Sequence, residues 1–245
     1  MQPGPAGNSL PLPASTPAET RIYAIGDIHG RADLLREVLE RLDEDQRRRP
    51  IAYATEIFLG DYIDRGPDSK GVIDLLAERL VRNHSVCLRG NHEELMESFL
   101  HDPSMLDSWL KLGGRQTLTS YGVVPRFDGT ESGDDLRQRF CRAFPRTHQL
   151  FLQCLKPWVC CGDYLFVHAG IRPQVPLEQQ TMQDLLWIRE EFLNSSLQHG
   201  KYIVHGHTPV AHPDVRRNRI DIDTGAWRSG TLTCAVLEGT SIQFL

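Results

Sequence analysis

The sequence lacks the features of a secreted, membrane-bound or nucleic-acid-binding protein. Its first twenty residues contain no basic segment followed by an apolar one, and no uncharged run is long enough to span a bilayer. With 27 Lys and Arg against 32 Asp and Glu, the formal net charge of −5 offers no general attraction to nucleic acid or to an anionic membrane. These absences favour a cytoplasmic protein that binds neither nucleic acid nor membrane, and no feature points to an obligate partner.

Closely spaced cysteine pairs are also missing. The sequence contains no CxxC pair, and its six cysteines lie mostly within apolar segments: Cys87, Cys141, Cys154, Cys160, Cys161 and Cys234. This pattern excludes a small disulfide-stabilised scaffold. We expect the cysteines to be reduced residues of the core.

What is present is a repeated unit of strand, polar loop and helix. The apolar fraction of 40% in 245 residues is sufficient for a large core. Short apolar runs at 21–25, 56–59 and 85–88 each precede a polar loop, and helical periodicity follows over 32–42, over 72–80 and from residue 94. Three such units in series predict a parallel sheet with right-handed crossovers.

The remainder of the chain divides into a helical and a β-rich part. Residues 94–155 show apolar positions at helical spacing and predict an inserted helical layer or cap. Apolar runs typical of strands follow at 158–161, 164–167, 202–204, 220–222, 231–237 and 242–245. We therefore expect a flexible tail over 1–20, which is rich in Pro, Ala, Ser and Thr, and one α/β domain over 21–245 that carries the cap.

Polar side chains recur where the apolar strands end. They are Asp27 and His29, Asp61 and Asp64, Asn91 and His92, His168, and His205 and His207. Any one of these motifs alone is also typical of a surface turn or a local ion pair. Five such loops, each bracketed by glycines that allow tight turns, favour a single shared site.

The chemistry of this set indicates metal ions and phosphate. Carboxylates, imidazoles and one amide suit Mn, Fe or Zn better than Mg or Ca, and the set is too large for one ion. Two ions sharing a bridging ligand can act on both oxygens of an in-line displacement at phosphorus. The forked side chains of Arg65, Arg89 and Arg189 match phosphate oxygens. We therefore expect two divalent metal ions, with Mn²⁺ as first choice and Fe or Zn as alternatives, and a phosphoester substrate.

The chain resembles the metal-dependent phosphoprotein phosphatases among the calcineurin-like metallophosphoesterases, and in particular their bacterial and phage branch. The resemblance rests on five segments between residues 22 and 227: Gly26-Asp27-Ile28-His29-Gly30, Gly60-Asp61-Tyr62-Ile63-Asp64-Arg65-Gly66, Arg89-Gly90-Asn91-His92-Glu93, His168-Ala169-Gly170 and Gly206-His207-Thr208. It implies a four-layer αββα sandwich of two mixed β-sheets with the metals at the strand ends.

The same resemblance implies roles for individual residues. Asp27, His29 and Asp61 would bind the first metal, and Asp61, Asn91, His168 and His207 the second, so that Asp61 bridges. His92, held by Asp64, would be the general acid, and Arg65, Arg89 and Arg189 would bind the phosphate. His205 matches no ligand and is expected to support one, whereas Asp221 and Asp223 are interpreted as structural.

Three functions remain open at this stage. The first is a serine/threonine protein phosphatase that acts on phosphoprotein or phosphopeptide by direct attack of a metal-activated water. The second is a dinucleoside-polyphosphate hydrolase, such as a diadenosine tetraphosphate hydrolase. The third is a phosphate-binding module without turnover, which the intact pair Asp64 and His92 disfavours because a binder needs no acid.

Overall fold

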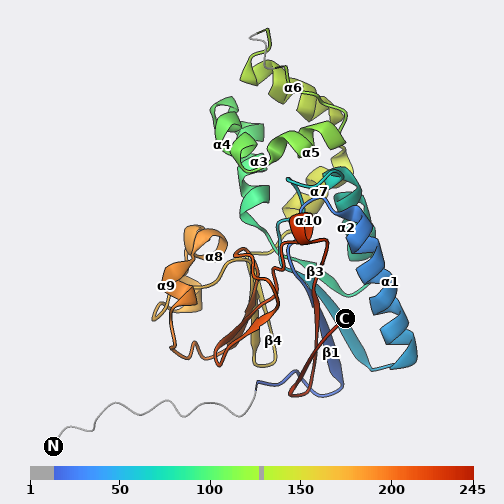
Figure 1. Ribbon diagram of the computed structural model, residues 1–245, viewed down its shortest axis with the longest axis vertical. Coiled ribbons are helices and arrows are strands. Elements are labelled where there is room, and N and C mark those ends of the chain that lie inside the picture. Colours follow the sequence, from blue (N-terminus) through green and yellow to red (C-terminus); the bar gives the residue numbers. More distant parts are fainter. Residues whose placement is uncertain (1–13, 127–129) are drawn as a thin grey trace, which may run out of the picture.

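The computed structural model describes residues 14–126 and 130–245. Two β-sheets face each other, helices cover their outer sides, and further helices stand above one end of the sheets (Figure 1). Most of the expected tail, residues 1–13, lies outside the described residues. Its last residues pack on the domain, because Thr16 N donates to Gly239 O at 3.0 Å and Thr20 begins the first strand.

The first sheet has the strand order β10-β9-β1-β2-β3. Its strands are β1 (Thr20–Ile25), β2 (Tyr53–Phe58), β3 (Ser85–Cys87), β9 (Cys234–Glu238) and β10 (Ser241–Phe244). β1, β2 and β3 are parallel, as the three strand-loop-helix units predict, and Ile25 pairs with Phe58, which pairs with Cys87. β9 and β10 add antiparallel pairs, so the sheet is mixed.

The second sheet has the order β4-β5-β6-β8-β7. Its strands are β4 (Trp158–Cys161), β5 (Tyr164–Val167), β6 (Tyr202–His205), β7 (Asp214–Val215) and β8 (Arg219–Asp221). β4 and β5 form the expected hairpin, and Gly162 turns it with a positive φ of 59°. β7 escaped prediction because two residues show no periodicity.

Alternating side chains show why the sheets form inner layers. Along β1, Ile22 and Ala24 join an apolar cluster with residues of the second sheet such as Phe166, whereas Tyr23 and Ile25 join the cluster that includes α1 and α2. On the second sheet, a separate cluster joins the outward side chains of β5 to residues of α8 and α9. Apolar faces on both sides of each sheet require two outer helical layers, which confirms the predicted αββα sandwich.

The helices outside the sheets differ in length. On the first sheet lie α1 (Ala32–Arg48) and α2 (Ser69–Arg82), whereas α8 (Met182–Trp187), α9 (Glu190–Leu193) and α10 (Ala226–Ser229) belong to the second half. The sequence pattern did not reveal these last three, because four to six residues are too few for a helical repeat.

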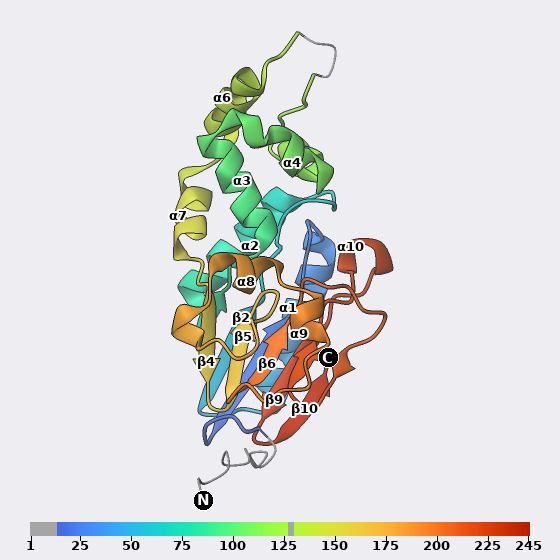
Figure 2. The same cartoon turned by 90° about the vertical axis from the view of Figure 1, so that its left-hand side faces the viewer.

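Helices also fill the stretch predicted as a cap. They are α3 (Asn91–His101), α4 (Leu106–Lys111), α5 (Gly114–Ser120), α6 (Gly133–Ala143) and α7 (Arg146–Cys154), with short 3₁₀ turns at Pro103–Met105 and, later in the chain, Leu177–Gln179. Figure 2 shows them beyond the ends of the strands. α3 begins at Asn91 rather than at the expected Glu94. The role of these helices in shaping a substrate groove stays a prediction.

The cysteine prediction was partly wrong. All six cysteines are free, and Cys87 and Cys234 are buried. Cys141, Cys154 and Cys160 are exposed, because they lie on outward faces of α6, α7 and β4, and Cys161 is partly exposed. Apolar neighbours in sequence did not decide which face each thiol occupies.

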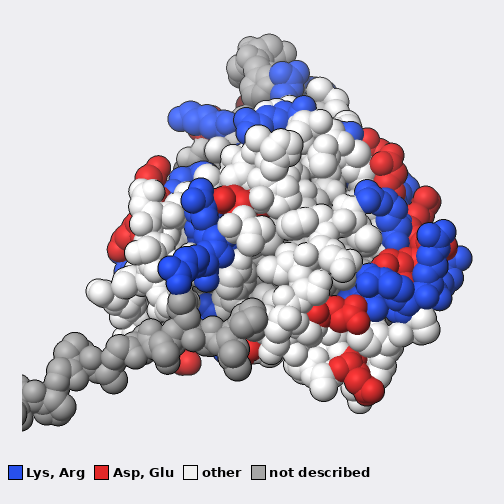
Figure 3. Space-filling view, turned by 60° about the horizontal axis from the view of Figure 1, so that its bottom comes forward, with Lys and Arg blue, Asp and Glu red and all other residues white. Residues whose placement is uncertain are grey.

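The surface mixes charges of both signs. At the right-hand edge of the face in Figure 3, acidic and basic side chains lie next to one another, and on α1 Glu44 pairs with both Arg47 and Arg48. Over 14–126 and 130–245, every helix is too short or too polar to cross a bilayer.

Candidate metal centre

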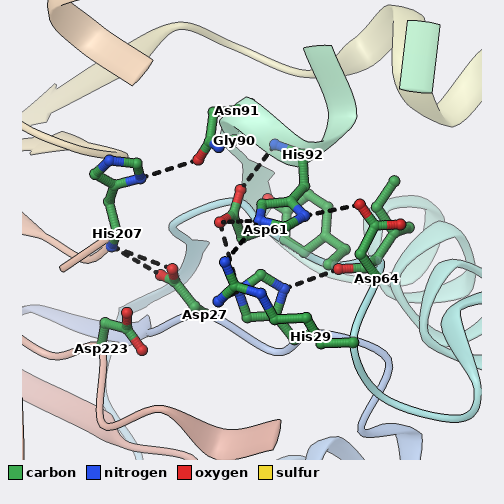
Figure 4. Close-up of polar contacts among 12 residues, drawn as sticks. Asp27, His29, Asp61, Asp64, Gly90, Asn91, His92, His207 and Asp223 are labelled. Atoms are coloured by element: carbon green, nitrogen blue, oxygen red, sulfur yellow. Dashed lines mark hydrogen bonds and ion pairs between the residues drawn. The ribbon is translucent and has the colours of Figure 1, made fainter. Parts of the chain in front are cut away.

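The polar residues predicted from the strand ends lie together at one end of the two sheets (Figure 4). Loops after β1, β2, β3, β5 and β6 bring eight of them into one group, and each is at most 5% exposed: Asp27, His29, Asp61, Asp64, Asn91, His92, His168 and His207. The carboxyl ends of parallel strands open at the same edge of a sheet, which is why loops distant in sequence meet here.

Five residues of these loops have a left-handed backbone. The φ angles of His29, Asp61 and His207 are 46°, 51° and 68°, and those of Asp64 and Arg65 are 71° and 65°. Non-glycine residues rarely adopt this conformation, which costs on the order of 1–3 kcal/mol each and is concentrated at functional sites. The fold therefore loses some stability to hold these side chains in their directions.

The glycines of the motifs let neighbouring loops touch. A Cβ atom on Gly60 would lie 2.7 Å from the backbone nitrogen of Gly90, and one on Gly30 would lie 2.8 Å from the carbonyl oxygen of Gly66. Both Gly60 and Gly30 also have positive φ. The glycines thus allow the loops to pack backbone against backbone around the polar group.

His29 and His168 each present a lone pair to Asp61. Burial lowers the pKa of both rings, so they are neutral near pH 7. Their Nδ1 atoms lie 2.8 Å from the Ile63 carbonyl and 2.9 Å from the Leu59 carbonyl, and each must donate because a carbonyl only accepts. The unprotonated Nε2 atoms then face the Asp61 carboxylate at 3.5 and 3.3 Å. Acceptors facing each other in this way are stabilised by a cation between them, and Arg65 Nη1 already lies 3.1 Å from Nε2 of His29. Histidine ligands of metals are oriented by this kind of bond at the other ring nitrogen.

Asn91 extends the same arrangement. Its Oδ1 lies 2.9 Å from Nε2 of His168 and 2.9 Å from Nδ1 of His207. Burial lowers the pKa of His207 to about 2, and among the described residues its Nε2 has no hydrogen-bond partner. An amide oxygen and two neutral imidazoles are ligands that suit a transition metal.

Asp61 belongs to two groups of possible metal ligands. One contains Asp61, His29 and His92, and the other contains Asp61, His168 and His207; within each group the ligand atoms lie within 4.8 Å of one another. The residues therefore fit metal ions, and Asp61 is the carboxylate that both groups share.

Asp27 lies beside the first group and adds another buried carboxyl group to it. Its Oδ2 accepts from the backbone N–H of His207 at 3.1 Å. Burial, followed by the charges of Asp223 and Asp61, raises its pKa well above the usual value. Burying carboxylates close together is unfavourable, and cations bound between them would offset this cost.

His92 and Asp64 form a hydrogen-bonded pair at the centre. Nδ1 of His92 lies 2.7 Å from Oδ2 of Asp64, while Trp109 Nε1 and Thr117 Oγ1 donate to the same carboxylate. Burial alone would lower the pKa of His92, but the charges of Asp61 and Asp64 and the hydrogen bond to Asp64 together raise it. His92 is thereby suited to hold a proton.

Three side chains that support the site were not assigned from the sequence: Trp109, Thr117 and Glu93. Glu93 accepts from the backbone N–H groups of Asp61, Tyr62 and Gly90 at 2.8 to 3.0 Å. An acidic residue three positions after Gly90 is a helix-capping signal that sequence reasoning could have used. Trp109 and Thr117 carry no such local signal, because they reach Asp64 from distant helices.

The three predicted phosphate-binding arginines differ in position. Arg65 donates from Nη1 and Nη2 to Nε2 of His29 and of His92, both at 3.1 Å, so its fork faces the centre. Arg189 is near the same site and donates to Thr208 Oγ1 at 3.1 Å. Arg89 instead contacts Glu97 and the carbonyl oxygen of Leu152. Its role as a phosphate ligand stays a prediction.

The side chain of His205 contacts groups other than the predicted ligands. Its ring lies 3.3 Å from Arg219 Nη1 and 3.8 Å from the Asp221 carboxylate, and it packs against Phe192. Nδ1 of His205 also lies 3.1 Å from the carbonyl oxygen of Gly206, the residue before His207. The expectation that His205 supports a metal ligand stays a prediction.

The comparison with known protein families agrees with this geometry. The sequence profile of the calcineurin-like phosphoesterases matches residues 20–228. The chain belongs to this family. Calcineurin-like phosphoesterases are metal-dependent, and the two groups around Asp61 are the candidate metal-binding residues of this member.

Relatives within the family include both dinucleoside tetraphosphatases and a serine/threonine-protein phosphatase. The chain is 27% identical to the bis(5'-nucleosyl)-tetraphosphatase PrpE of Oceanobacillus iheyensis, over 87% of each protein. It is 28% identical to serine/threonine-protein phosphatase 1 of Salmonella typhimurium, over 89% of this chain and 92% of the relative. The structure of a cold-active protein-tyrosine phosphatase from a Shewanella species matches with a TM-score of 0.62 at 17% identity, over 94% of this chain and 80% of the other, which supports the fold alone.

Proposed function

We propose that this calcineurin-like phosphoesterase hydrolyses phosphomonoesters and that its substrates are proteins phosphorylated on serine or threonine. Two divalent ions, Mn²⁺ by first choice, would be held by the predicted ligands: Asp27, His29, Asp61, Asn91, His168 and His207. When bound, the ions would supply Lewis acidity at the phosphoryl group and an activated water for in-line attack. The observation that carries the proposal is the hydrogen-bonded pair of His92 and Asp64.

This pair is suited to a poor leaving group. The alkoxide of serine or threonine needs a proton as it departs, and general-acid catalysis contributes about 10²–10⁴-fold. Nδ1 of His92 is engaged by Asp64, so Nε2, which lies 3.1 Å from Nη2 of Arg65 in this structure, is the nitrogen that would donate toward a substrate. Trp109 and Thr117 fix the carboxylate of Asp64, which keeps the imidazole in one orientation.

The arginines support binding of a doubly charged phosphate. Arg65 directs two N–H donors into the centre, and its guanidinium lies 5.5 Å from the ring centroid of Trp227. Arg189 lies near His207, and its charge contributes to the lowered pKa of that ring. A planar fork of donors matches two phosphate oxygens at once.

Hydrolysis of dinucleoside polyphosphates is the second candidate. The similarity to PrpE favours it, and so does the 38% exposed ring of Trp227 beside Arg65, on which a nucleobase could stack. Its leaving group is itself a phosphate and has less need of an acid than an alkoxide has. The paired Asp64 and His92 therefore favour the phosphomonoesterase.

A direct competition between substrates tests the proposal. The purified protein, loaded with Mn²⁺, is assayed for kcat/KM on a phosphoserine peptide, a phosphothreonine peptide and diadenosine tetraphosphate. Higher kcat/KM on the phosphopeptides is the expected result. Preference for diadenosine tetraphosphate would establish the second candidate, and phosphate binding without turnover of any substrate would overturn both.

A further inference from the structure

Asp223 is a buried carboxylate that none of the roles above uses. It follows β8, is 1% exposed, and lies beside Asp27 (Figure 4). Its Oδ1 accepts from the backbone N–H of Gly225 at 2.8 Å. Among the described residues, its Oδ2 has no hydrogen-bond partner. A buried carboxylate oxygen without a donor is unfavourable and calls for a further partner.

Backbone contacts fix where this oxygen lies. The N–H of Asp223 donates to Oδ1 of Asp221 at 3.0 Å, and its carbonyl oxygen accepts from Val210 N at 2.8 Å. The neighbouring residue Ile222 donates to His205 O at 3.0 Å. The main chain is thus held on both sides of Asp223, and the position of the carboxylate is built into the fold.

Two glycines bring Asp223 next to the metal centre. A Cβ atom on Gly26 would overlap the backbone of Ile222, so the ends of β1 and β8 touch, and the next residues of both are Asp27 and Asp223. A Cβ atom on Gly206 would overlap Oδ1 of Asp27 and lie 3.6 Å from Cβ of Asp223. The two acidic residues therefore border the same glycine.

Charges of both signs lie around Asp223. Burial raises its pKa to about 6, and the nearby charge of Asp61 adds to this effect, while Arg65 and Arg228 oppose it. Asp27, Asp61 and Asp223 are thus three buried carboxylates in one small region. The fork of Arg65 is already directed to two histidines.

Asp221 shows what a purely structural acid looks like in the same segment. It is also 1% exposed, but one oxygen accepts from Asp223 N and the other lies 3.8 Å from His205. Its neighbours are groups of the protein that fix a turn. The sequence interpretation treated both acids as structural. Each accepts a turn N–H through Oδ1, and what sets Asp223 apart is its buried Oδ2, which has no hydrogen-bond partner among the described residues.

We infer that Asp223 is a further acidic residue of the metal centre, whose free Oδ2 and negative charge stabilise the cation held by Asp27. This inference rests on the proposed function, because it needs a cation at that place. Asp223 thereby adds an oxygen and a charge next to Asp27, where the family resemblance assigned no further acidic residue. It acts through the ion and is a positioning residue.

Metal binding to the metal-free protein tests this inference without reference to activity. The Kd for Mn²⁺ is measured by isothermal titration calorimetry for wild type and Asp223→Asn, which keeps an oxygen to accept from Gly225. Loss of a residue that supports a metal costs about 10–100-fold in affinity, and we expect a weakening in this range. The Tm of the metal-free variant should not fall, because the substitution removes one of three clustered carboxylates and so reduces the repulsion among them.

Two matched variants separate the possible outcomes. Asp27→Asn should weaken Mn²⁺ binding as a removed ligand does, and Glu56→Gln, which alters a buried carboxylate far from the centre, should leave the Kd unchanged. If Asp223→Asn binds Mn²⁺ as wild type does while Asp27→Asn does not, the inference is wrong and the proposed function stands. If wild type binds no Mn²⁺, Zn²⁺ or Fe²⁺, the proposed function itself is wrong.

A second substitution covers the case in which Asp223→Asn does not fold. Asp223→Ser retains a small hydroxyl that can accept from Gly225 and removes the charge. The same loss of Mn²⁺ affinity is expected for it. Unchanged affinity in whichever variant folds would assign Asp223 to the turn alone and overturn the inference.

Discussion

Glu56 and Asp61 are two buried carboxylates only five positions apart, yet they have opposite surroundings. Glu56, on β2, is 1% exposed and accepts from Arg79, Asn83 and Ser85 at distances of 2.8 to 3.1 Å. Asp61, just beyond the strand, is 2% exposed, and its side chain faces the lone pairs of His29 and His168. Burial is therefore equal, and the supply of donors is what differs.

This difference separates a structural acid from a functional one. The charge of Glu56 is neutralised within the protein by the guanidinium of Arg79, so this carboxylate needs no further partner. Among the described residues, Asp61 has no arginine or lysine partner: its Oδ1 accepts from the backbone N–H of His92 at 3.2 Å, and the lone pairs of His29 and His168 face its carboxylate. A shortage of donors around a buried carboxylate thus identifies the site better than burial does.

Removal of the shared carboxylate should have the largest effect. Asp61→Asn should lose bound metal and activity together, by on the order of 10³-fold or more in kcat, because metal ions supply several kcal/mol of transition-state stabilisation. Metal content by elemental analysis and turnover of a phosphopeptide are measured on the same sample. Wild-type metal content with near-normal turnover would contradict the bridging role of Asp61.

The next effect concerns the acid. His92→Asn should lower kcat by about 10²–10⁴-fold on a phosphoserine peptide, the usual size of general-acid catalysis. The loss should be much smaller on an aryl phosphate, whose leaving group needs little help from a proton. Equal losses on the two substrates would mean that His92 acts on the metals or on folding and not as the acid.

A smaller loss is expected for the phosphate fork. Arg65→Ala should raise KM and lower kcat, by about 10–100-fold in kcat/KM, because hydrogen bonds to charged groups contribute about 1.5–3 kcal/mol. Metal content should stay at the wild-type level. Unchanged KM and kcat would remove Arg65 from the site.

Arg89→Ala is the matched comparison for that variant. In this structure Arg89 contacts Glu97 and Leu152, so we expect a smaller change in kcat/KM than for Arg65→Ala. An equal loss in both variants would show that Arg89 turns toward the phosphate when substrate binds, as the family resemblance implies.

The smallest effect on catalysis should come from the paired acid. Glu56→Gln should leave kcat, KM and metal content unchanged and lower the free energy of unfolding by about 1–3 kcal/mol, because the donors of Arg79 lose a charged acceptor. Urea unfolding of the metal-free protein measures this change. Loss of metal in Glu56→Gln would contradict the conclusion that Glu56 is structural and Asp61 is functional.

Much of the architecture was predictable from local patterns. The runs at 21–25, 56–59 and 85–88 correspond to β1, β2 and β3, and the polar loops after them meet at one edge of the sheet. Apolar periodicity and glycine-bracketed turns are properties of short segments, so they can be recognised before any contact is known. For the same reason the motif residues Asp27, Asp61 and Asn91 could be named in advance.

Contacts between distant segments could not be predicted in this way. Trp109 and Thr117 hold Asp64 across 45 and 53 positions, and no periodicity connects them. Arg89 lies in a motif that matches the family, but the direction of its side chain is set by its contact with Glu97. The outward faces of the exposed cysteines were likewise decided by how α6, α7 and β4 pack.

The sequence by itself determined the strands, the loops and the chemical types of the residues brought to the strand ends, because these depend on backbone preference and on burial of apolar side chains along one segment. Only the tertiary structure decided which polar atoms find partners. Asp221 and Asp223 stand two positions apart in one motif and each accepts one turn N–H, yet of the two only Asp223 keeps a buried oxygen without a hydrogen-bond partner among the described residues, beside Asp27. That distinction arises where the ends of β1 and β8 touch, in two different sheets, and a hydrogen bond or its absence exists only once both are in place.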